Sequence, residues 1–190
     1  MKKATIIAAL LISSAAATFA QTWSVDKAHS RLGFNVTHLT VAELGGTFNS
    51  IDAKFTSAKP DFTDAVIELS AEVGSINTDN EQRDGHLKSP DFFDAAKFPT
   101  LTFKSTSFKK VSDKKYKLSG DLTLKGVTKP VVLDVVFGGT TTNPMSKKTI
   151  AGFKITGVIK RSDFGIAASM PAGMLSDEVT LQASTEFAKD

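Results

Sequence analysis

Residues 179–187, with the sequence VTLQASTEF, alternate apolar and polar side chains without a break. Successive side chains of a β-strand point to opposite faces, so Leu181 and Phe187 share one face while Gln182 and Glu186 share the other. A strand with one apolar and one polar face is typical of an antiparallel sheet that has water on one side. This stretch therefore predicts a strand that covers a core.

The same alternation recurs along the chain. The other predicted apolar faces are Leu32, Phe34, Val36 and His38; Ile67, Leu69, Ala71 and Val73; Leu101, Phe103, Ser105 and Ser107; Leu118, Leu122 and Leu124; Val131, Leu133, Val135 and Phe137; and Phe153, Ile155, Gly157 and Ile159. Turn signals such as Gly45-Gly46 and Lys125-Gly126 separate them. About eight strands in one domain predict an all-β fold, either a closed up-and-down barrel or a sandwich.

Residues 77–98 break this pattern. Asp79, Asn80 and Glu81 open the segment as residues at a capped helix start do, with acidic groups where the helix dipole favours them. We expect a helical insertion of about 10–15 residues, laid over one end of the barrel.

The predicted inward faces mix large and small residues. Gly120, Gly157 and Ser105 lie among phenylalanines and leucines, and the chain has 14 Phe against one Trp and one Tyr. Small residues in a barrel wall leave a channel for an apolar ligand, or they serve only the bend of the wall. The sequence leaves both interpretations open.

The first twenty residues resemble a secretory signal peptide. Lys2 and Lys3 precede an apolar run from Ala4 to Leu11, and small residues lead to a cleavage site after Ala20. We expect residues 1–20 (Met1 to Ala20) to be removed and residues 21–190 to form one domain in the periplasm. Lys+Arg then falls from 23 to 21 against 20 acidic residues, a near-neutral balance that argues against nucleic-acid binding.

The chain has no cysteine, which excludes disulfides, thiolate zinc sites, a cysteine nucleophile and a lipid-modified cysteine. No other apolar stretch is long enough for an integral membrane span. His29 and His38 lie too far apart on an extended strand to share a metal ion, so we expect no metal site. No serine-nucleophile or phosphate-loop motif is present.

Four stretches together resemble the YceI-like polyisoprenoid-binding family, over nearly all of residues 23–190. They are Asp26-Lys27-Ala28-His29-Ser30 with Phe34-Asn35-Val36-Thr37-His38 and Gly46-Thr47-Phe48; Arg83 to Asp94 with Phe98-Pro99; Gly120 to Pro130; and Arg161-Ser162-Asp163-Phe164-Gly165-Ile166. The resemblance implies an extended, lipocalin-like antiparallel β-barrel of about eight strands with a short helical insertion. It also implies a lumen that holds a long-chain isoprenoid, a quinone or a fatty amphiphile.

We therefore expect a periplasmic lipid-binding protein, with no cofactor, and not an enzyme. The rival hypotheses are a lipid-modifying enzyme that uses a histidine at the barrel mouth, and a ligand-free structural stress-response barrel. The oligomeric state is left open, a homodimer included. The expected ligand-binding residues are Phe34, Val36, His38, Phe48, Arg83, His86, Phe92, Phe93, Phe103, Leu122, Phe153, Ile155, Arg161 and Phe164.

Overall fold

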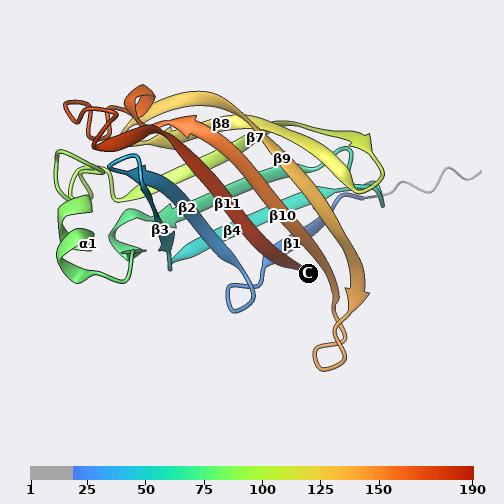
Figure 1. Ribbon diagram of the computed structural model, residues 1–190. Coiled ribbons are helices and arrows are strands. Elements are labelled where there is room, and N and C mark those ends of the chain that lie inside the picture. Colours follow the sequence, from blue (N-terminus) through green and yellow to red (C-terminus); the bar gives the residue numbers. More distant parts are fainter. Residues whose placement is uncertain (1–18) are drawn as a thin grey trace, which may run out of the picture.

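The computed structural model describes residues 19–190, which are mostly β-strand (Figure 1). The strands are β1 (Gln21–Val25), β2 (Arg31–His38), β3 (Ala42–Phe48), β4 (Ile51–Ser57), β5 (Val66–Glu72), β6 (Ile76–Asn77), β7 (Thr100–Ser112), β8 (Lys115–Leu124), β9 (Val127–Thr142), β10 (Thr149–Lys160) and β11 (Leu175–Lys189). The helical elements are η1 (Val73–Ser75), α1 (Glu81–Leu87) and η2 (Arg161–Phe164). Nearly all of the expected signal peptide, residues 1–18, lies outside the described residues.

Eight strands form a closed antiparallel ring in the order β1-β4-β5-β7-β8-β9-β10-β11. The ring closes because the last residues of β11 pair with β1, where Phe187 lies opposite Val25. Earlier residues of β11 pair with β2, from Leu175 opposite His38 to Ser184 opposite Arg31. β1 and β2 thus lie end to end along β11 as two halves of one barrel strand. The predicted barrel is confirmed, and the sandwich alternative is wrong.

The next two barrel strands are broken in the same way. β3 pairs with β2 while β4 pairs with β1, and β6 pairs with β3 while β5 pairs with β4. The breaks lie next to each other, because the Asn49 N–H donates to the Ser75 carbonyl at 3.2 Å and the Ser50 N–H donates to Ser75 Oγ at 2.9 Å. On this side of the barrel, three neighbouring wall strands are therefore each interrupted, and the interruptions lie side by side. The remaining strands, β7 to β11, run without such a break.

The two-residue period places the apolar faces inward as predicted on most strands. Leu118, Leu122 and Leu124 are buried on β8, while Lys117 and Asp121 on the alternate face are exposed. β7 departs from the prediction. A bulge between Ser105 and Ser107 shifts the pairing with β8, so that Phe108 faces inward in place of Ser107.

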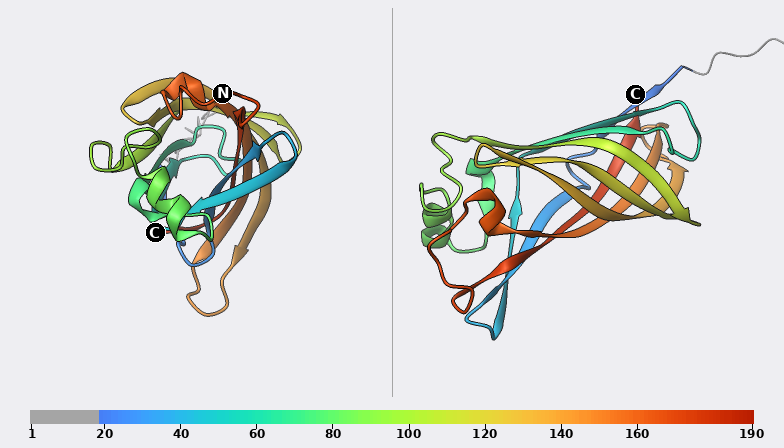
Figure 2. Two further views of the ribbon diagram at one scale, coloured as in Figure 1. Left: turned by 60° about the vertical axis from the view of Figure 1, so that its left-hand side comes forward. Right: turned by 90° about the horizontal axis from the view of Figure 1, so that it is seen from above.

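The insertion between β6 and β7 carries α1 across one end of the barrel (Figure 2). The helix has 7 residues, so the predicted length of 10–15 was too long. Asn80 caps it by accepting a hydrogen bond from the Arg83 N–H at 2.9 Å. Beyond Leu87 the chain turns at Ser89-Pro90 and returns through irregular turns to β7. Within residues 19–190, no helix has the length and apolar character needed to cross a bilayer.

Hydrogen bonds attach the turn between β1 and β2 to β11 on the outside of the barrel. The Asp26 N–H donates to the Glu186 carbonyl at 2.8 Å, and the Glu186 N–H donates to Ser30 Oγ at 3.0 Å. His29 Nδ1 donates to Asp26 Oδ2 at 2.9 Å. This hydrogen bond raises the pKa of His29 above its ordinary 6.5 and lowers the pKa of Asp26 below its ordinary 3.8. The turn is therefore held most firmly when His29 is protonated and Asp26 is not.

We predict that the His29–Asp26 pair makes stability depend on pH. Because the pKa of His29 is higher in the folded state, protonated His29 stabilises the fold fully at a pH below its unfolded pKa. This stabilisation is lost as the pH rises through the folded pKa, so the melting temperature falls between about pH 5.5 and about pH 8. His29→Asn should flatten that fall, and so should Asp26→Asn. Thermal melts followed by circular dichroism at the two pH values give the measurement. An unchanged slope in both variants would assign the pH dependence to other groups.

Candidate functional site

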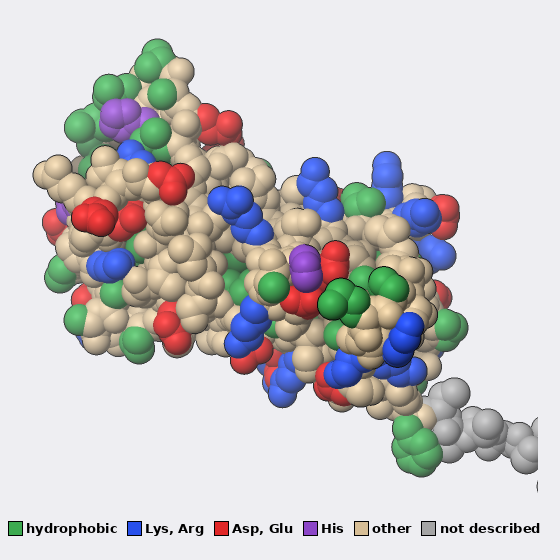
Figure 3. Space-filling model, turned by 90° about the horizontal axis from the view of Figure 1, so that it is seen from below, with side chains coloured by type: hydrophobic (Ala, Val, Ile, Leu, Met, Phe, Trp, Pro, Cys, Tyr) green, Lys and Arg blue, Asp and Glu red, His purple; other side chains and the backbone are tan. Residues whose placement is uncertain are grey.

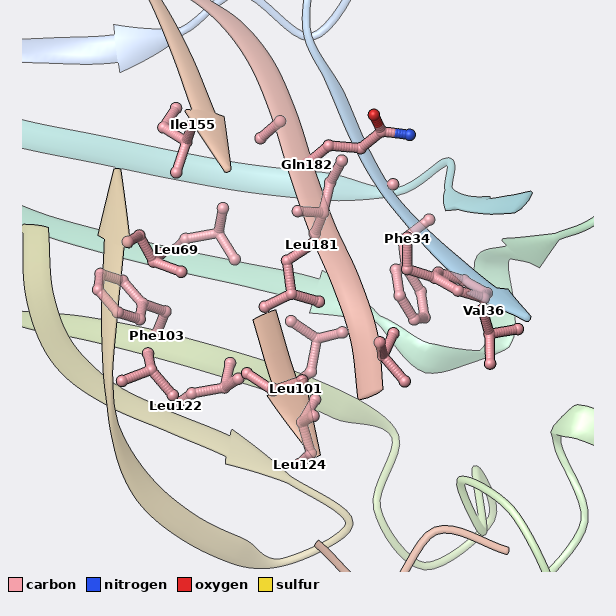
Figure 4. Close-up of a pocket in the computed structure, with 18 of the residues that line it drawn as sticks. Phe34, Val36, Leu69, Leu101, Phe103, Leu122, Leu124, Ile155, Leu181 and Gln182 are labelled. Atoms are coloured by element: carbon pink, nitrogen blue, oxygen red, sulfur yellow. The ribbon is translucent and has the colours of Figure 1, made fainter. Parts of the chain in front are cut away.

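The barrel encloses a lumen of about 570 Å³. Figure 4 shows the side chains that converge on it from strands around the ring, among them Leu69, Phe103, Leu122, Ile155 and Leu181. Apolar side chains make up almost the whole lining. The polar side chains in the lining are His38, Thr78, Arg83, His86, Arg161, Gln182 and Thr185. The lumen thus combines an apolar body with a few polar groups, which is the usual composition of a small-molecule site.

Aromatic rings close the end of the lumen away from α1. Trp23, Phe55, Phe62, Phe153 and Phe187 pack with centroid separations between 5.1 and 6.1 Å, mostly edge to face, and Phe137 joins them. We call these six residues the aromatic plug.

Phe62 reaches the plug from the β4–β5 loop with a left-handed backbone (φ 58°). Tyr116 Oη donates to the Asp61 carbonyl at 3.0 Å and so holds that loop in place. This contact was not predicted from the sequence, because a loop residue shares no period with a strand.

Glycines in the wall provide room for neighbouring side chains. A Cβ at Gly120 would lie 2.4 Å from the Phe103 ring, and a Cβ at Gly157 would lie 2.4 Å from the Leu133 side chain. Each glycine lets its neighbour lie flat against the wall, which leaves the centre of the lumen free. The small residues therefore serve the channel indirectly. A large residue at Gly157 would collide with Leu133 before it reached the centre of the lumen.

A lid covers the α1 end of the lumen; we define it as residues 78–99. Arg83 lines the cavity, where its Nε donates to Thr78 Oγ1 at 2.8 Å and its Nη2 donates to the Thr78 carbonyl at 2.6 Å. Thr78 in turn donates through its N–H to Asp84 Oδ1 at 2.9 Å. Within the described residues, the guanidinium forms no ion pair.

The aromatic residues of the lid pack onto the barrel. Phe93 meets Phe48 of β3 edge to face at 5.8 Å, and Phe48 contacts Phe34 at 5.9 Å. Phe92 is buried beneath the exposed His86, and their ring centroids lie 4.8 Å apart. These contacts place an apolar layer under the lid and leave His86 at its outer side.

Lys125 links three separate parts of the chain at this end. Its Nζ donates to the Pro90 carbonyl of the lid at 2.7 Å and to the Gly165 carbonyl at 2.9 Å. The Ala167 N–H donates to the Asp91 carbonyl at 2.8 Å, which joins the same segments directly. The ring of Phe98 lies against Gly126, at 2.4 Å from where a Cβ would stand. The lid, the β8–β9 turn and the segment after β10 therefore form one connected structure.

Arg161 is buried, and all its donors bind backbone carbonyls. Nε donates to Ser176, Nη1 to Ile166 and Ala167, and Nη2 to Met170 and Leu175. A guanidinium has five N–H groups, so none is left over for a ligand. Although Arg161 contacts the lumen, its hydrogen bonds shape the loop between η2 and β11.

The predicted site residues mostly converge. The lumen lining includes Phe34, Val36, His38, Phe48, Arg83, His86, Phe92, Phe93, Phe103, Leu122, Phe153, Ile155 and Arg161. Phe164 is outside the lining; it is 1% exposed and packs in the core beside η2. Its neighbour Gly165, with φ 65°, turns the chain there. That the other residues contact a ligand stays a prediction.

The three histidines do not assemble. His38 and His86 line the lumen, while His29 lies on the outer turn. In residues 19–190, the group of three acidic or histidine residues with mutually close ligand atoms is Asp26, His29 and Glu186, whose atoms lie within 4.8 Å of one another. This group therefore combines two carboxylates with one histidine on the outer wall, and it is not a histidine site at the mouth of the barrel.

Sequence reasoning missed several lining residues. Thr78 precedes the helix, and Met170 and Met174 belong to the loop between η2 and β11, which has no strand period. Lys125 lies in a predicted turn, but its two carbonyl partners are 35 and 40 residues away. Only the folded chain brings them together.

These features define a lipocalin-like barrel with a closed aromatic end, an apolar lumen and a tethered lid. A family model, the YceI-like domain, matches residues 23–187. The chain belongs to the YceI-like domain family.

Relatives agree over nearly the whole length. A UPF0312 protein of Staphylococcus aureus is 38% identical over 169 residues, which cover 87% of this chain and 96% of the relative. The Campylobacter jejuni YCEI protein is 36% identical, with a TM-score of 0.74 and coverage of 87% of this chain and 96% of that one.

More distant structures share the fold. Burkholderia cenocepacia BcnA is 22% identical, with a TM-score of 0.77 and coverage of 85% and 98% of the two chains. A polyisoprenoid binding domain from Saccharophagus degradans, implicated in plant cell wall breakdown, is 17% identical, with a TM-score of 0.65 and coverage of 90% and 99%.

We predict that Arg161→Met lowers the free energy of unfolding by about 3–5 kcal/mol, the scale for removing one member of a buried charged network. The carbonyls that Arg161 satisfies would lose their donor in a buried setting. Lys160→Met provides the control, because Lys160 is exposed and adjacent; its effect should stay within about 0.5 kcal/mol. Urea unfolding measures both. Equal effects of the two substitutions would contradict the role given to Arg161.

Proposed function

We propose that this protein binds the chain of a long apolar lipid, such as an isoprenoid, inside its barrel. The observation that supports this most directly is the lumen itself, a space of about 570 Å³ lined almost wholly by apolar side chains. The polyisoprenoid binding domain of Saccharophagus degradans has the same fold, which agrees with the proposal. A quinone or a fatty amphiphile satisfies the same apolar chemistry.

The size of the lumen fits a chain of moderate length. Taking the roughly 30 Å³ that one water occupies in the liquid as the size of a methylene group, the lumen holds about twenty such groups. Burial contributes roughly 0.8 kcal/mol per methylene, or about 16 kcal/mol in all. Association costs about 4–15 kcal/mol in lost freedom. Apolar burial alone is therefore large enough to hold the ligand.

We further propose that the role is binding without a catalytic step. The histidine that has a carboxylate partner, His29 with Asp26, lies on the outer turn and away from the lumen lining. The buried cation of the lumen, Arg161, is fully committed to backbone carbonyls. Neither group is placed to transfer a proton to or from a bound lipid.

We propose a periplasmic location after export. Lys2, Lys3 and the apolar run to Leu11 have the pattern of a signal peptide. The described strands begin at Gln21, directly after the predicted cleavage point. The removal of residues 1–20 would thus leave the barrel complete.

Native mass spectrometry of the exported protein tests these proposals together. We expect a chain that begins at Gln21 and carries a co-purified lipid of about twenty or more carbons. Leu181→Trp should weaken lipid binding by about 1–3 kcal/mol, because the larger ring fills the middle of the lumen. Val132→Trp is the matched control, since Val132 is 60% exposed on the outer face of β9. A lipid-free wild-type protein that also fails to take up added geranylgeraniol would sink the binding proposal.

We predict that Arg83 contacts the head group. The bonds to Thr78 leave part of its guanidinium free toward the lumen. Arg83→Ala should then weaken a pyrophosphate-headed isoprenoid by about 1–3 kcal/mol, the scale of a charge-assisted hydrogen bond. A neutral lipid of equal chain length should lose little. Titration calorimetry with both ligands decides, and equal losses would show that Arg83 only supports the lid.

A further inference from the structure

Two segments form a projecting tip at the mouth of the lumen. The turn between β2 and β3, residues 39–41, lies against the loop of residues 165–174 (Figure 2). The Leu39 N–H donates to the Met174 carbonyl at 3.0 Å, and the adjoining residues His38 and Leu175 are paired. We call these two segments the mouth tip.

The mouth tip exposes large apolar side chains. Val41 is 85% exposed, and Leu39 and Met174 are each 50% exposed. Neither residues 39–42 nor residues 165–175 contain a charged side chain. Figure 3 shows hydrophobic side chains gathered on the projecting end of this face, beside a histidine. Apolar patches of this kind at the edge of a binding site are typical of an interaction surface.

The backbone of the turn pushes these side chains outward. Leu39 and Thr40 both have left-handed backbones, with φ of 50° and 61°. Such angles are uncommon outside glycine and reverse the chain within two residues. Leu39 and Thr40 form the apex of the turn, and Val41, whose N–H donates to the His38 carbonyl at 3.2 Å, follows them with its side chain exposed. The result is a convex tip, not a flat face or a groove.

The mouth tip is continuous with the lumen. His38, Met170, Met174 and Leu175 belong to the tip or adjoin it, and all four line the cavity. A lipid that enters or leaves past these residues stays in contact with apolar side chains throughout. If the lipid chain had to cross bulk water at the mouth tip, its exposure would cost roughly 0.8 kcal/mol per methylene group.

The opposite end of the barrel differs in charge. Its exposed apolar residues stand among lysines: Val111 follows Lys109 and Lys110, and Met145 precedes Lys147 and Lys148. The mouth tip itself therefore carries no charged side chain, whereas the exposed apolar residues at the end with the aromatic plug stand beside lysines.

We propose that the mouth tip inserts into the hydrocarbon edge of a lipid bilayer. This inference builds on the proposed lipid-binding function, because the bilayer is then the source or the destination of the bound chain. A convex, uncharged tip made of two turns suits shallow insertion, in which affinity grows with the apolar area buried. A protein seated on the tip would instead cover the opening through which the lipid passes.

Binding to vesicles of phosphatidylcholine alone tests the proposal, since these carry no net charge for the lysines to meet. The wild-type protein should co-float with the vesicles. Val41→Asp should weaken this binding by about tenfold or more, because the new carboxylate would have to enter hydrocarbon. Val111→Asp is the matched control: the same substitution at a 63% exposed valine of the opposite end should change binding less than twofold, an order-of-magnitude bound.

Other outcomes overturn the proposal. Binding that needs anionic lipid and is equal in both variants would assign the contact to the basic end. A dimer that Val41→Asp converts to a monomer in analytical ultracentrifugation, without vesicle binding by the wild type, would assign the tip to a second copy of the chain.

A separate readout distinguishes this proposal from the lipid-binding one. Geranylgeraniol added in detergent reaches the lumen without a vesicle. Val41→Asp should therefore keep its lipid adduct in native mass spectra while losing vesicle binding. Vesicle binding by a wild-type protein that takes up no geranylgeraniol would instead leave the docking surface standing and remove the proposed function.

Discussion

The pairing of β11 with both β1 and β2 is the constraint on which the rest of the structure depends. It joins β11 to β1 and so closes the ring of eight strands, while the earlier residues of β11 pair with β2. It also fixes the register, because a slip by one residue would turn Leu181 and Phe187 toward water. The inward side chains of all the barrel strands then point into one shared interior. A lumen, a plugged end and a mouth are defined only once this closure is made.

Closure alone does not preserve an empty interior, since apolar side chains tend to collapse into it. Two arrangements oppose that collapse here. Rings lie flat against the wall where glycine gives them room, as Phe103 does at Gly120. The lid is held by Lys125 and the adjacent backbone hydrogen bonds, in addition to the packing of Phe93 on Phe48. The lumen is therefore kept open by the tethered lid at its end and by the glycine positions in its wall.

The alternation of side chains predicted the barrel and most of its inward faces, because a period of two follows from strand geometry alone. It failed at the β7 bulge, where Ser105 and Ser107 offer no apolar side chain to mark the change of phase that turns Phe108 inward. It gave no account of Phe62, which enters the core from a loop. Phe164 was expected in the lumen because an apolar character does not tell which side of a short helix is covered.

The aromatic plug closes one end of the tube-shaped lumen. A molecule held in such a tube has a fixed polarity: its apolar tail goes in first and its head comes last. The depth of the lumen would then set the length of the chain that fits inside it. A chain shorter than the lumen leaves a void at the bottom, whereas the surplus of a longer chain projects from the opening. Any protein that receives the cargo would meet the head group before it meets the tail.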